Sequence, residues 1–255
     1  MRVAALMSGS GTNLVKILEN KAHGSAYQVV CILTDHPESN ALAIAKKFKI
    51  PYEENDIAAF YRKKGTPRSN LSVRPEFDRI TVAKLTPHRP DALAYCGYMS
   101  LASSVLVNAF LGVNVHPADL RILDKGGRRR FVGPHAVRDA IMAGEKQLRS
   151  STHLVSEKAD QGAILMVSQP VPVKLPKGFD RNDAGQVEAV ATKHQEQLKE
   201  KGDWVIFAKT LEAIGQKRFA KDGKGRLYFD GKAMPKGDTT SKRIIKKIGI
   251  KKTNR

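Results

Sequence analysis

Apolar runs alternate with segments of helical spacing through the first half of the chain. The runs that predict buried strands are residues 2–7, 27–34, 50–52, 91–99 and 112–116. The segments that predict helices are residues 12–21, 40–49 and 74–90, the last of them ended by prolines. This alternation is typical of an α/β fold with a mostly parallel sheet and helices on both faces. Ligands of such folds bind beyond the carboxyl ends of the strands.

The second half has a different pattern. Residues 150–156 and the mostly apolar residues 162–173 flank a turn at Asp160-Gln161-Gly162, which predicts neighbouring strands, at least partly antiparallel. Helical spacing returns at 182–200 and 203–215, and a two-part strand around Asp230-Gly231 is predicted within 225–237. The apolar stripe of the first of these helices consists of Val187, Val190, Ala191, His194 and Leu198.

Length and composition fit one large domain. The chain has 255 residues, of which 41% are hydrophobic, enough for a core, and no apolar run approaches the length of a membrane span. The apolar patch Val3–Met7 is too short for a secretory signal. Cys31 and Cys96 lie in apolar sequence, so we expect reduced core residues of a cytoplasmic protein, with neither a disulfide nor a zinc site.

The net charge of +19 is concentrated towards the end of the chain. Residues 193–255 contain 18 Lys or Arg and 7 Asp or Glu, and residues 241–255 contain seven cations and no acid. This end is either a solvated basic tail or an attractant for polyanions such as RNA or phosphorylated small molecules. The tail has no aromatic platform, so we favour the first and do not expect a nucleic-acid partner.

A glycine-containing loop follows the first predicted strand. In "SGSGTN", residues 8–13, two glycines permit a tight turn, and the N–H groups that open the next helix favour an anion. Leu14 occupies the third glycine position of the dinucleotide fingerprint, and the Gly-Lys-Ser/Thr of a P-loop is missing. The loop is therefore either a plain strand-to-helix turn or a phosphate site.

Polar residues interrupt the strand at 112–116. Asn114 and His116 are two positions apart, so both side chains point to the same face. Asp160 lies in the turn between two apolar segments, where a carboxylate without a partner would be costly. An amide donor, an imidazole and an orienting carboxylate suit direct attack of an amine on an acyl carbon. No Ser or Cys lies in a nucleophile-elbow context, so covalent acyl transfer is not expected.

Four segments in one order resemble the folate-dependent formyltransferases, and within that family the branch that acts on glycinamide ribonucleotide. They are "SGSGTNL", "RPDALAYCGYM", "NVHP" and "HLVSEKADQGAIL", and the similarity runs from Val3 to about Gly237. The resemblance implies a Rossmann-like formyltransferase fold. It also implies transfer of a formyl group from 10-formyltetrahydrofolate, a co-substrate, to a phosphorylated amine in purine biosynthesis, without a metal. A homodimer is one candidate assembly.

The resemblance also implies roles for individual residues. Asn114, His116 and Asp160 match the catalytic set, and Ser10, Gly11, Thr12 and Asn13 match the loop that holds the substrate phosphate. The residues that match folate contacts are Met99, Ser100, Leu101, Ala102, His153 and Asp160. Substrate contacts are predicted at Gly133, His135 and Glu196. We predict one domain over 1–237, with a phosphate-binding half at 1–112 and a catalytic, folate-binding half at 113–237, followed by a flexible basic tail at 238–255.

The segment after His116 departs from the family pattern. Residues 118–132 are longer than usual and include Arg128, Arg129 and Arg130, which form either a solvated loop or a second clamp on an anionic substrate. The acceptor therefore has alternatives: an amino sugar nucleotide, methionyl-tRNA, or water in a 10-formyltetrahydrofolate hydrolase. We expect too little chain after 237 for the tRNA enzymes and none before the first strand for a hydrolase's regulatory domain. A basic nucleic-acid-binding module is the non-enzymatic alternative.

Overall fold

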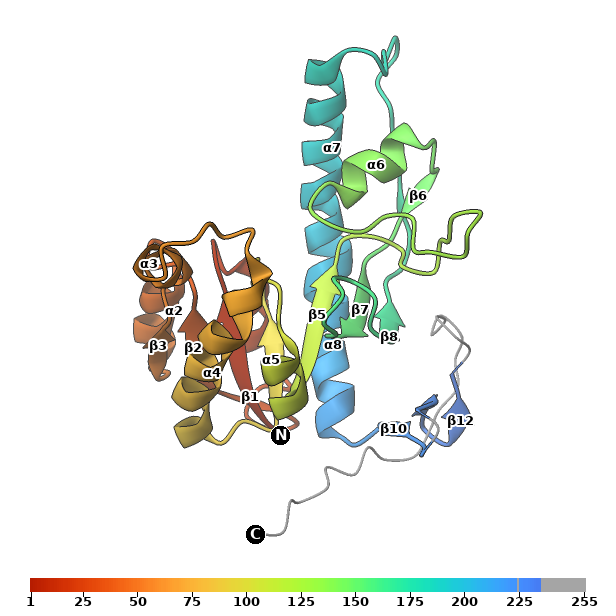
Figure 1. Ribbon diagram of the computed structural model, residues 1–255. Helices are drawn as coiled ribbons and strands as arrows, with labels where there is room; N and C mark the ends of the chain where they lie inside the picture. Colours follow the sequence, from red (N-terminus) through yellow and green to blue (C-terminus); the bar gives the residue numbers. More distant parts are fainter. Residues whose placement is uncertain (224, 235–255) are drawn as a thin grey trace.

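A twisted sheet runs through the middle of the molecule in the computed structural model, which describes residues 1–223 and 225–234 (Figure 1). Within these residues the sheet has seven strands in the order β3-β2-β1-β4-β5-β7-β8. The strands from β3 to β5 are parallel, whereas β7 is antiparallel to both β5 and β8. Their bounds are β1 (Arg2–Met7), β2 (Gln28–Thr34), β3 (Tyr52–Glu54), β4 (Ala92–Tyr95), β5 (Leu111–His116), β7 (Ser151–Leu154) and β8 (Ile164–Val167). The predicted fold class is confirmed.

Both faces of the parallel part are buried, which explains its continuous apolar runs. In β1, Val3, Ala5 and Met7 pack into one core and Ala4 and Leu6 into another. The first core includes residues of α1 (Thr12–Leu18), α2 (Ala41–Phe48) and α8 (Trp204–Gly215), and the second includes residues of α4 (Arg74–Leu85) and α5 (Ser104–Ala109). Outside these lie α3 (Ile57–Lys63), η1 (Leu71–Val73) and η2 (Thr86–His88).

The order of the strands creates a crevice. From β1 the chain proceeds outward to β2 and β3, and then returns to the other side of β1 as β4. The loops that follow β1 and β4 therefore lead away from each other at the carboxyl edge, which is where ligands of such sheets bind.

The second half extends the molecule along a helical column. Figure 1 shows α7 (Ala184–Leu198) and α8 in succession, joined by the π-helical segment η3 (Lys199–Asp203). The predicted stripe of α7, from Val187 to Leu198, is buried as expected. It covers a further core with α6 (Ala136–Met142) and the two-stranded sheet of β6 (Gln147–Leu148) and β9 (Val171–Pro172).

A small antiparallel sheet follows α8 and contains β10 (Phe219–Lys221), β11 (Leu227–Phe229) and β12 (Lys232–Ala233). Asp230 and Gly231 turn the chain between β11 and β12 with φ of 48° and 86°. The two-part strand predicted there is confirmed, because a tight hairpin turn needs positive φ at both central residues.

Four features differ from the sequence-based expectations. The connection before β5 contains α5, α3 was not anticipated, and Val171 pairs with β6 rather than with the main sheet. The division at residue 112 falls inside β5. The tail at 238–255 lies outside the described residues. The single domain with two halves stays a prediction.

Two further expectations concern the cysteines and membrane-spanning helices. Cys31 and Cys96 are free and buried, as predicted. Among residues 1–223 and 225–234, no helix combines the length and the apolar character that a membrane span needs.

Candidate active site

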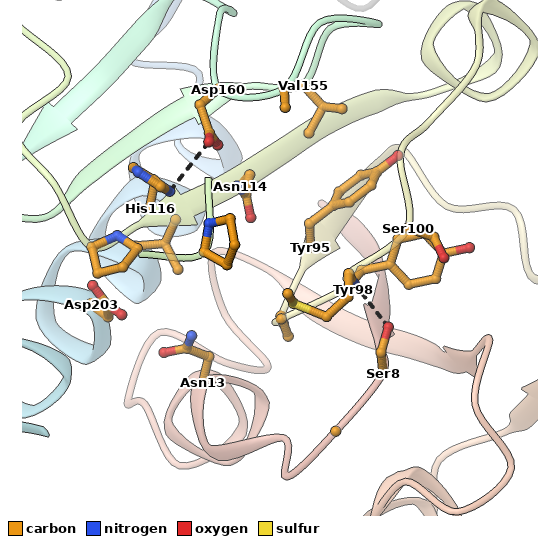
Figure 2. Close-up of a pocket in the computed structure, with 18 of the residues that line it drawn as sticks. Ser8, Asn13, Tyr95, Tyr98, Ser100, Asn114, His116, Val155, Asp160 and Asp203 are labelled. Atoms are coloured by element: carbon orange, nitrogen blue, oxygen red, sulfur yellow. Dashed lines mark hydrogen bonds and ion pairs between the residues drawn. The ribbon is translucent and has the colours of Figure 1, made fainter. Parts of the chain in front are cut away.

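A cavity of about 560 Å³ lies at the carboxyl edge of β1, β4 and β5 (Figure 2). Its walls come from the glycine loop after β1, the loop after β4, the end of β5, the turn before β8, and the end of α7 with η3. All predicted site residues line it except His135 and Glu196. The lining ones are Ser10, Gly11, Thr12, Asn13, Met99, Ser100, Leu101, Ala102, Asn114, His116, Gly133, His153 and Asp160.

Strand β5 delivers two of these side chains to the same place. Asn114 and His116 both line the cavity, whereas the alternating Val113 and Val115 pack into the core on the opposite face. Because β5 lies between β4 and β7, the strand is held on both sides. The valines thus fix the amide and the imidazole on a rigid element.

His116 has one ring nitrogen fixed by the chain. Its Nε2 lies 3.0 Å from the carbonyl oxygen of Phe131, which can only accept, so Nε2 carries a hydrogen. Its Nδ1 lies 3.5 Å from Oδ2 of Asp160, and Figure 2 shows the two side chains facing each other. Burial lowers the pKa of His116, and the charge of Asp160 partly opposes that shift. Nδ1 is therefore the nitrogen that can gain and lose a proton.

Asp160 is held as a carboxylate. Burial alone would raise its pKa, but contacts with His153 and His116 and the N–H of Gly133, 3.0 Å from Oδ2, lower the pKa to about 2. The residue has φ of 54°, in the left-handed region that non-glycine residues seldom adopt. The carboxylate can therefore orient His116 and stabilise its imidazolium form.

His153 connects the catalytic residues across two strands. It lies opposite Asn114 in the β5–β7 pair, and its Nδ1 donates to the carbonyl of Leu154 at 2.8 Å. Its Nε2 lies 3.2 Å from Nδ2 of Asn114 and 3.4 Å from Oδ1 of Asp160. A neutral ring accepts from the amide, and a protonated ring donates to the carboxylate. His153 thus contacts both Asn114 and Asp160, in addition to lining the cavity where it was predicted to contact folate.

A buried carboxylate that the sequence reasoning missed joins the loops of the crevice. Asp35, 2% exposed, accepts from Ser8 Oγ at 2.6 Å and from the hydroxyl of Ser100. Ser8 Oγ in turn accepts from the N–H of Met99 at 2.9 Å. Asp35 directly follows the apolar run of β2, and a lone acid at a strand end was the available signal.

The loop after β4 alternates between anchored and exposed residues. Ser100 and Ala102 are buried, whereas Met99 is 70% exposed and Leu101 43% exposed. Exposed large apolar side chains that line the cavity offer a surface for a flat ring system.

The cavity wall formed by α7 and η3 differs from the prediction. Glu196 is exposed and its side chain pairs with Lys199 at 2.5 Å, so it does not reach the cavity, and His135 is exposed at the start of α6. Gln195, Lys199 and Asp203 line the wall instead. These three residues follow one another at intervals of four, so the face that reaches the cavity continues from α7 into the π-helical η3.

Two buried acceptor oxygens among the residues that line the cavity have no hydrogen-bond partner within the described residues. They are Oδ1 of Asn13 and Oδ1 of Asp203. Asp203 is 4% exposed, and burial raises its pKa to about 7. Buried acceptors of this kind call for donors, which a bound molecule with N–H or O–H groups would supply.

The residues 1–178 match the model of the family described as "Formyl transferase". The chain belongs to this family. This formyl transferase is 28% identical over 239 residues to a phosphoribosylglycinamide formyltransferase of Haemophilus influenzae, covering 92% of the chain and 96% of the relative. It is also 25% identical over 179 residues to an enzyme of that name from Escherichia coli, covering 68% of the chain and 74% of the relative. The chain is therefore an enzyme of formyl-group transfer.

Solved structures have the same fold as this formyl transferase. A phosphoribosylglycinamide formyltransferase of Coxiella burnetii superposes with a TM-score of 0.70 at 19% identity. The superposition covers 93% of this chain and 97% of the Coxiella burnetii chain. Glycinamide ribonucleotide transformylase 1 of Symbiobacterium toebii superposes with a TM-score of 0.67 at 24% identity, covering 90% of this chain and 93% of the transformylase chain. The mixed sheet with its antiparallel additions is thus a family feature. Among the described residues, no group of three or more His, Cys, Asp or Glu side chains is placed to hold a metal ion.

Proposed function

We propose that this formyl transferase moves a formyl group from 10-formyltetrahydrofolate to the amine of glycinamide ribonucleotide, in de novo purine biosynthesis. The observation that carries the proposal is the meeting of Asn114, His116 and Asp160 in the cavity that the glycine loop also lines. The names of the similar enzymes from Haemophilus influenzae and Escherichia coli support the choice of acceptor.

The arrangement suits direct transfer. The amine nitrogen attacks the formyl carbon, the carbonyl π pair moves to oxygen, and the N–H of Asn114 donates to the oxyanion. The tetrahedral intermediate collapses by breaking the bond to N10 of the folate. His116, through Nδ1, carries the proton that leaves the amine and must reach N10, while Asp160 stabilises the charged ring. The formyl carbon keeps its oxidation state throughout.

The lining residues suit the two substrates in different ways. The N–H groups at residues 10–13 favour the acceptor's phosphate, because the first-turn N–H groups of a helix lack helical partners. The apolar Met99 and Leu101 suit the flat pterin of the folate. The oxygens of Asn13 and Asp203 suit the hydroxyl or amine donors of a ribose-bearing acceptor. The last feature favours an acceptor larger than water.

An acceptor comparison tests the proposal. Consumption of 10-formyltetrahydrofolate is followed with glycinamide ribonucleotide, with water alone and with amino sugar nucleotides. We expect consumption that depends on glycinamide ribonucleotide. Equal consumption in water alone would identify a hydrolase, and a response to amino sugars only would replace the acceptor.

A substitution tests the catalytic assignment. Asn114→Ala removes the oxyanion donor, so kcat should fall by a factor that corresponds to roughly 2 to 4 kcal/mol of transition-state stabilisation. Asn108→Ala is the matched control, because Asn108 is exposed on α5. Unchanged turnover of Asn114→Ala, measured by steady-state kinetics, would contradict the mechanism.

The setting of the enzyme is also proposed. The buried, free cysteines Cys31 and Cys96 support a reducing compartment, and we infer a cytoplasmic location. A homodimer stays a prediction.

A further inference from the structure

The three consecutive arginines after His116 have different surroundings. Arg128 has an 84% exposed side chain that pairs with Asp124 at 3.0 Å, as expected of a solvated loop. Arg130 is exposed, whereas Arg129 is half-buried. The guanidinium of Arg129 donates from Nη1 to the carbonyl of Asp160 and from Nη2 to the carbonyl of Gly162 at 2.8 Å. Arg129 therefore contacts the turn that carries the catalytic carboxylate.

Residues 122–130, which contain the three arginines, are ordered by hydrogen bonds within the segment. Asp124 N–H donates to Arg128 O at 2.7 Å and Arg130 N–H to Ile122 O at 3.0 Å, on either side of an antiparallel bridge between Leu123 and Arg129. Arg129 is therefore held at the base of a short hairpin. Its side chain leaves from a fixed backbone, which a flexible loop could not provide.

The same segment contacts both members of the catalytic pair. Phe131 accepts from His116, and Gly133 donates to the carboxylate of Asp160. Between residues 129 and 133 the chain thus fixes the imidazole, the carboxylate and the backbone of the turn. The geometry of His116 against Asp160 depends on how this segment sits on the turn.

The turn itself needs external support. Asp160 has a left-handed φ of 54°, which costs free energy in a residue with a Cβ. At Gly162, a Cβ would lie 1.6 Å from the carbonyl oxygen of Leu154, so only glycine allows this close approach. The planar fork of Arg129 reaches carbonyls on both sides of residue 161. A lysine carries the same charge but cannot reproduce two parallel N–H donors.

We propose that Arg129 is a positioning residue for formyl transfer: its guanidinium holds the carbonyls of Asp160 and Gly162 and thereby sets the Asp160 carboxylate opposite His116. The inference rests on the proposed function for its kinetic test only. It differs from a clamp on an anionic substrate, because the donors of Arg129 are already directed to the protein backbone.

Arg129→Lys separates these roles, with Arg128→Lys as the matched control. Loss of the fork should lower kcat by about 10- to 100-fold, because a small displacement of a catalytic group is costly, with KM for both substrates within about twofold of the wild type. The control should keep wild-type values. A raised KM for the acceptor with unchanged kcat would identify a substrate clamp, and no change at all would remove the role; either result overturns the proposal.

A second measurement needs no substrate. The charged and titratable groups that act on His116 are Asp160, His153 and Arg129. Asp160 raises the pKa of His116, so a loosened turn should lower that pKa in Arg129→Lys, where the charge is retained. NMR titration of the histidine rings should show this downward shift and none in Arg128→Lys. An unchanged His116 titration in Arg129→Lys would overturn the proposal. Absence of formyl transfer in the wild type would instead contradict the proposed function, while the titration would still test Arg129.

Discussion

Asp203 is a carboxylic acid in a place where a charge is costly. It is 4% exposed and lines the cavity, and burial raises its pKa to about 7, with Ser150 and Lys199 opposing the shift. Near neutral pH the group therefore exchanges between a neutral donor and a charged acceptor. A substrate amine or hydroxyl at this wall would favour the charged form, so acceptor binding is coupled to the release of a proton.

The same pKa makes stability depend on pH. The folded pKa of about 7 exceeds the ordinary 3.8, so the folded state holds the proton more tightly than the unfolded state. The stabilisation is complete below about pH 4 and is lost as pH rises to about 7, with a total change of roughly 4 kcal/mol. In Asp203→Asn this component should vanish, flattening the free energy of unfolding over the same range. Denaturant unfolding at several pH values measures it.

An exposed acid provides the control for this prediction. Glu38→Gln alters a solvent-exposed carboxylate and should retain the wild-type dependence on pH. An equally steep dependence in Asp203→Asn would show that other groups cause it.

Residue-level predictions succeeded where a simple period applied. Asn114 and His116 could be placed on one face because a strand has a period of two. Asp203 could not be found in this way, because η3 breaks the helical period between Glu196 and α8. Arg129 was noticed for its charge, but its partners, the carbonyls of Asp160 and Gly162, lie more than thirty residues away.

At the scale of elements, the turn between β1 and α1 depends on one glycine. Gly11 has φ of 71°, and a Cβ there would lie 2.5 Å from Ile44 Cδ1 and 2.8 Å from Met7 Cε. Gly11→Ala should therefore destabilise the protein by about 1 to 3 kcal/mol, read from the midpoint of denaturant unfolding.

Gly9 is the matched control for this change, since a Cβ there would meet nothing within 4 Å. Gly9→Ala should leave the unfolding midpoint within about 0.5 kcal/mol of the wild type. Equal stability of the two variants would contradict the steric explanation.

Elements with long apolar patterns were predictable, and short ones were not. The stripe of α7 was identified residue by residue because the helix buries one face over four turns. Helix α5 has six residues, of which Leu106 is buried, so its pattern is too brief to distinguish from a loop. Such short helices form because neighbouring elements pack on them, here α4, and that packing is not visible in the local sequence.

At the scale of the whole molecule, β5 lies where the parallel and the antiparallel parts of the seven-stranded sheet meet. On one side it pairs in parallel with β4, and on the other it pairs antiparallel with β7, which supplies His153. The glycine loop comes from the first part of the chain, and Asp160 and Asp203 come from the second. The cavity is therefore complete only when both parts have packed against β5.

This arrangement predicts the order of events in refolding. Helical circular dichroism should recover in part before enzymatic activity, because local helices form faster than contacts between distant segments. Activity should appear with the slowest phase. The two signals are compared after dilution from denaturant, with native enzyme in the same residual denaturant as the reference. Activity that returns ahead of the dichroism would contradict the prediction.

The position of β5 also determines when the protein can act on a formylated folate. A chain in which β7 has not paired with β5 cannot present Asn114, His116 and Asp160 together, since Asp160 follows β7 in sequence whereas the other two lie on β5. Such a chain has no assembled catalytic set and cannot act on a formylated folate. Formyl transfer is thereby confined to molecules in which β5 and β7 have paired.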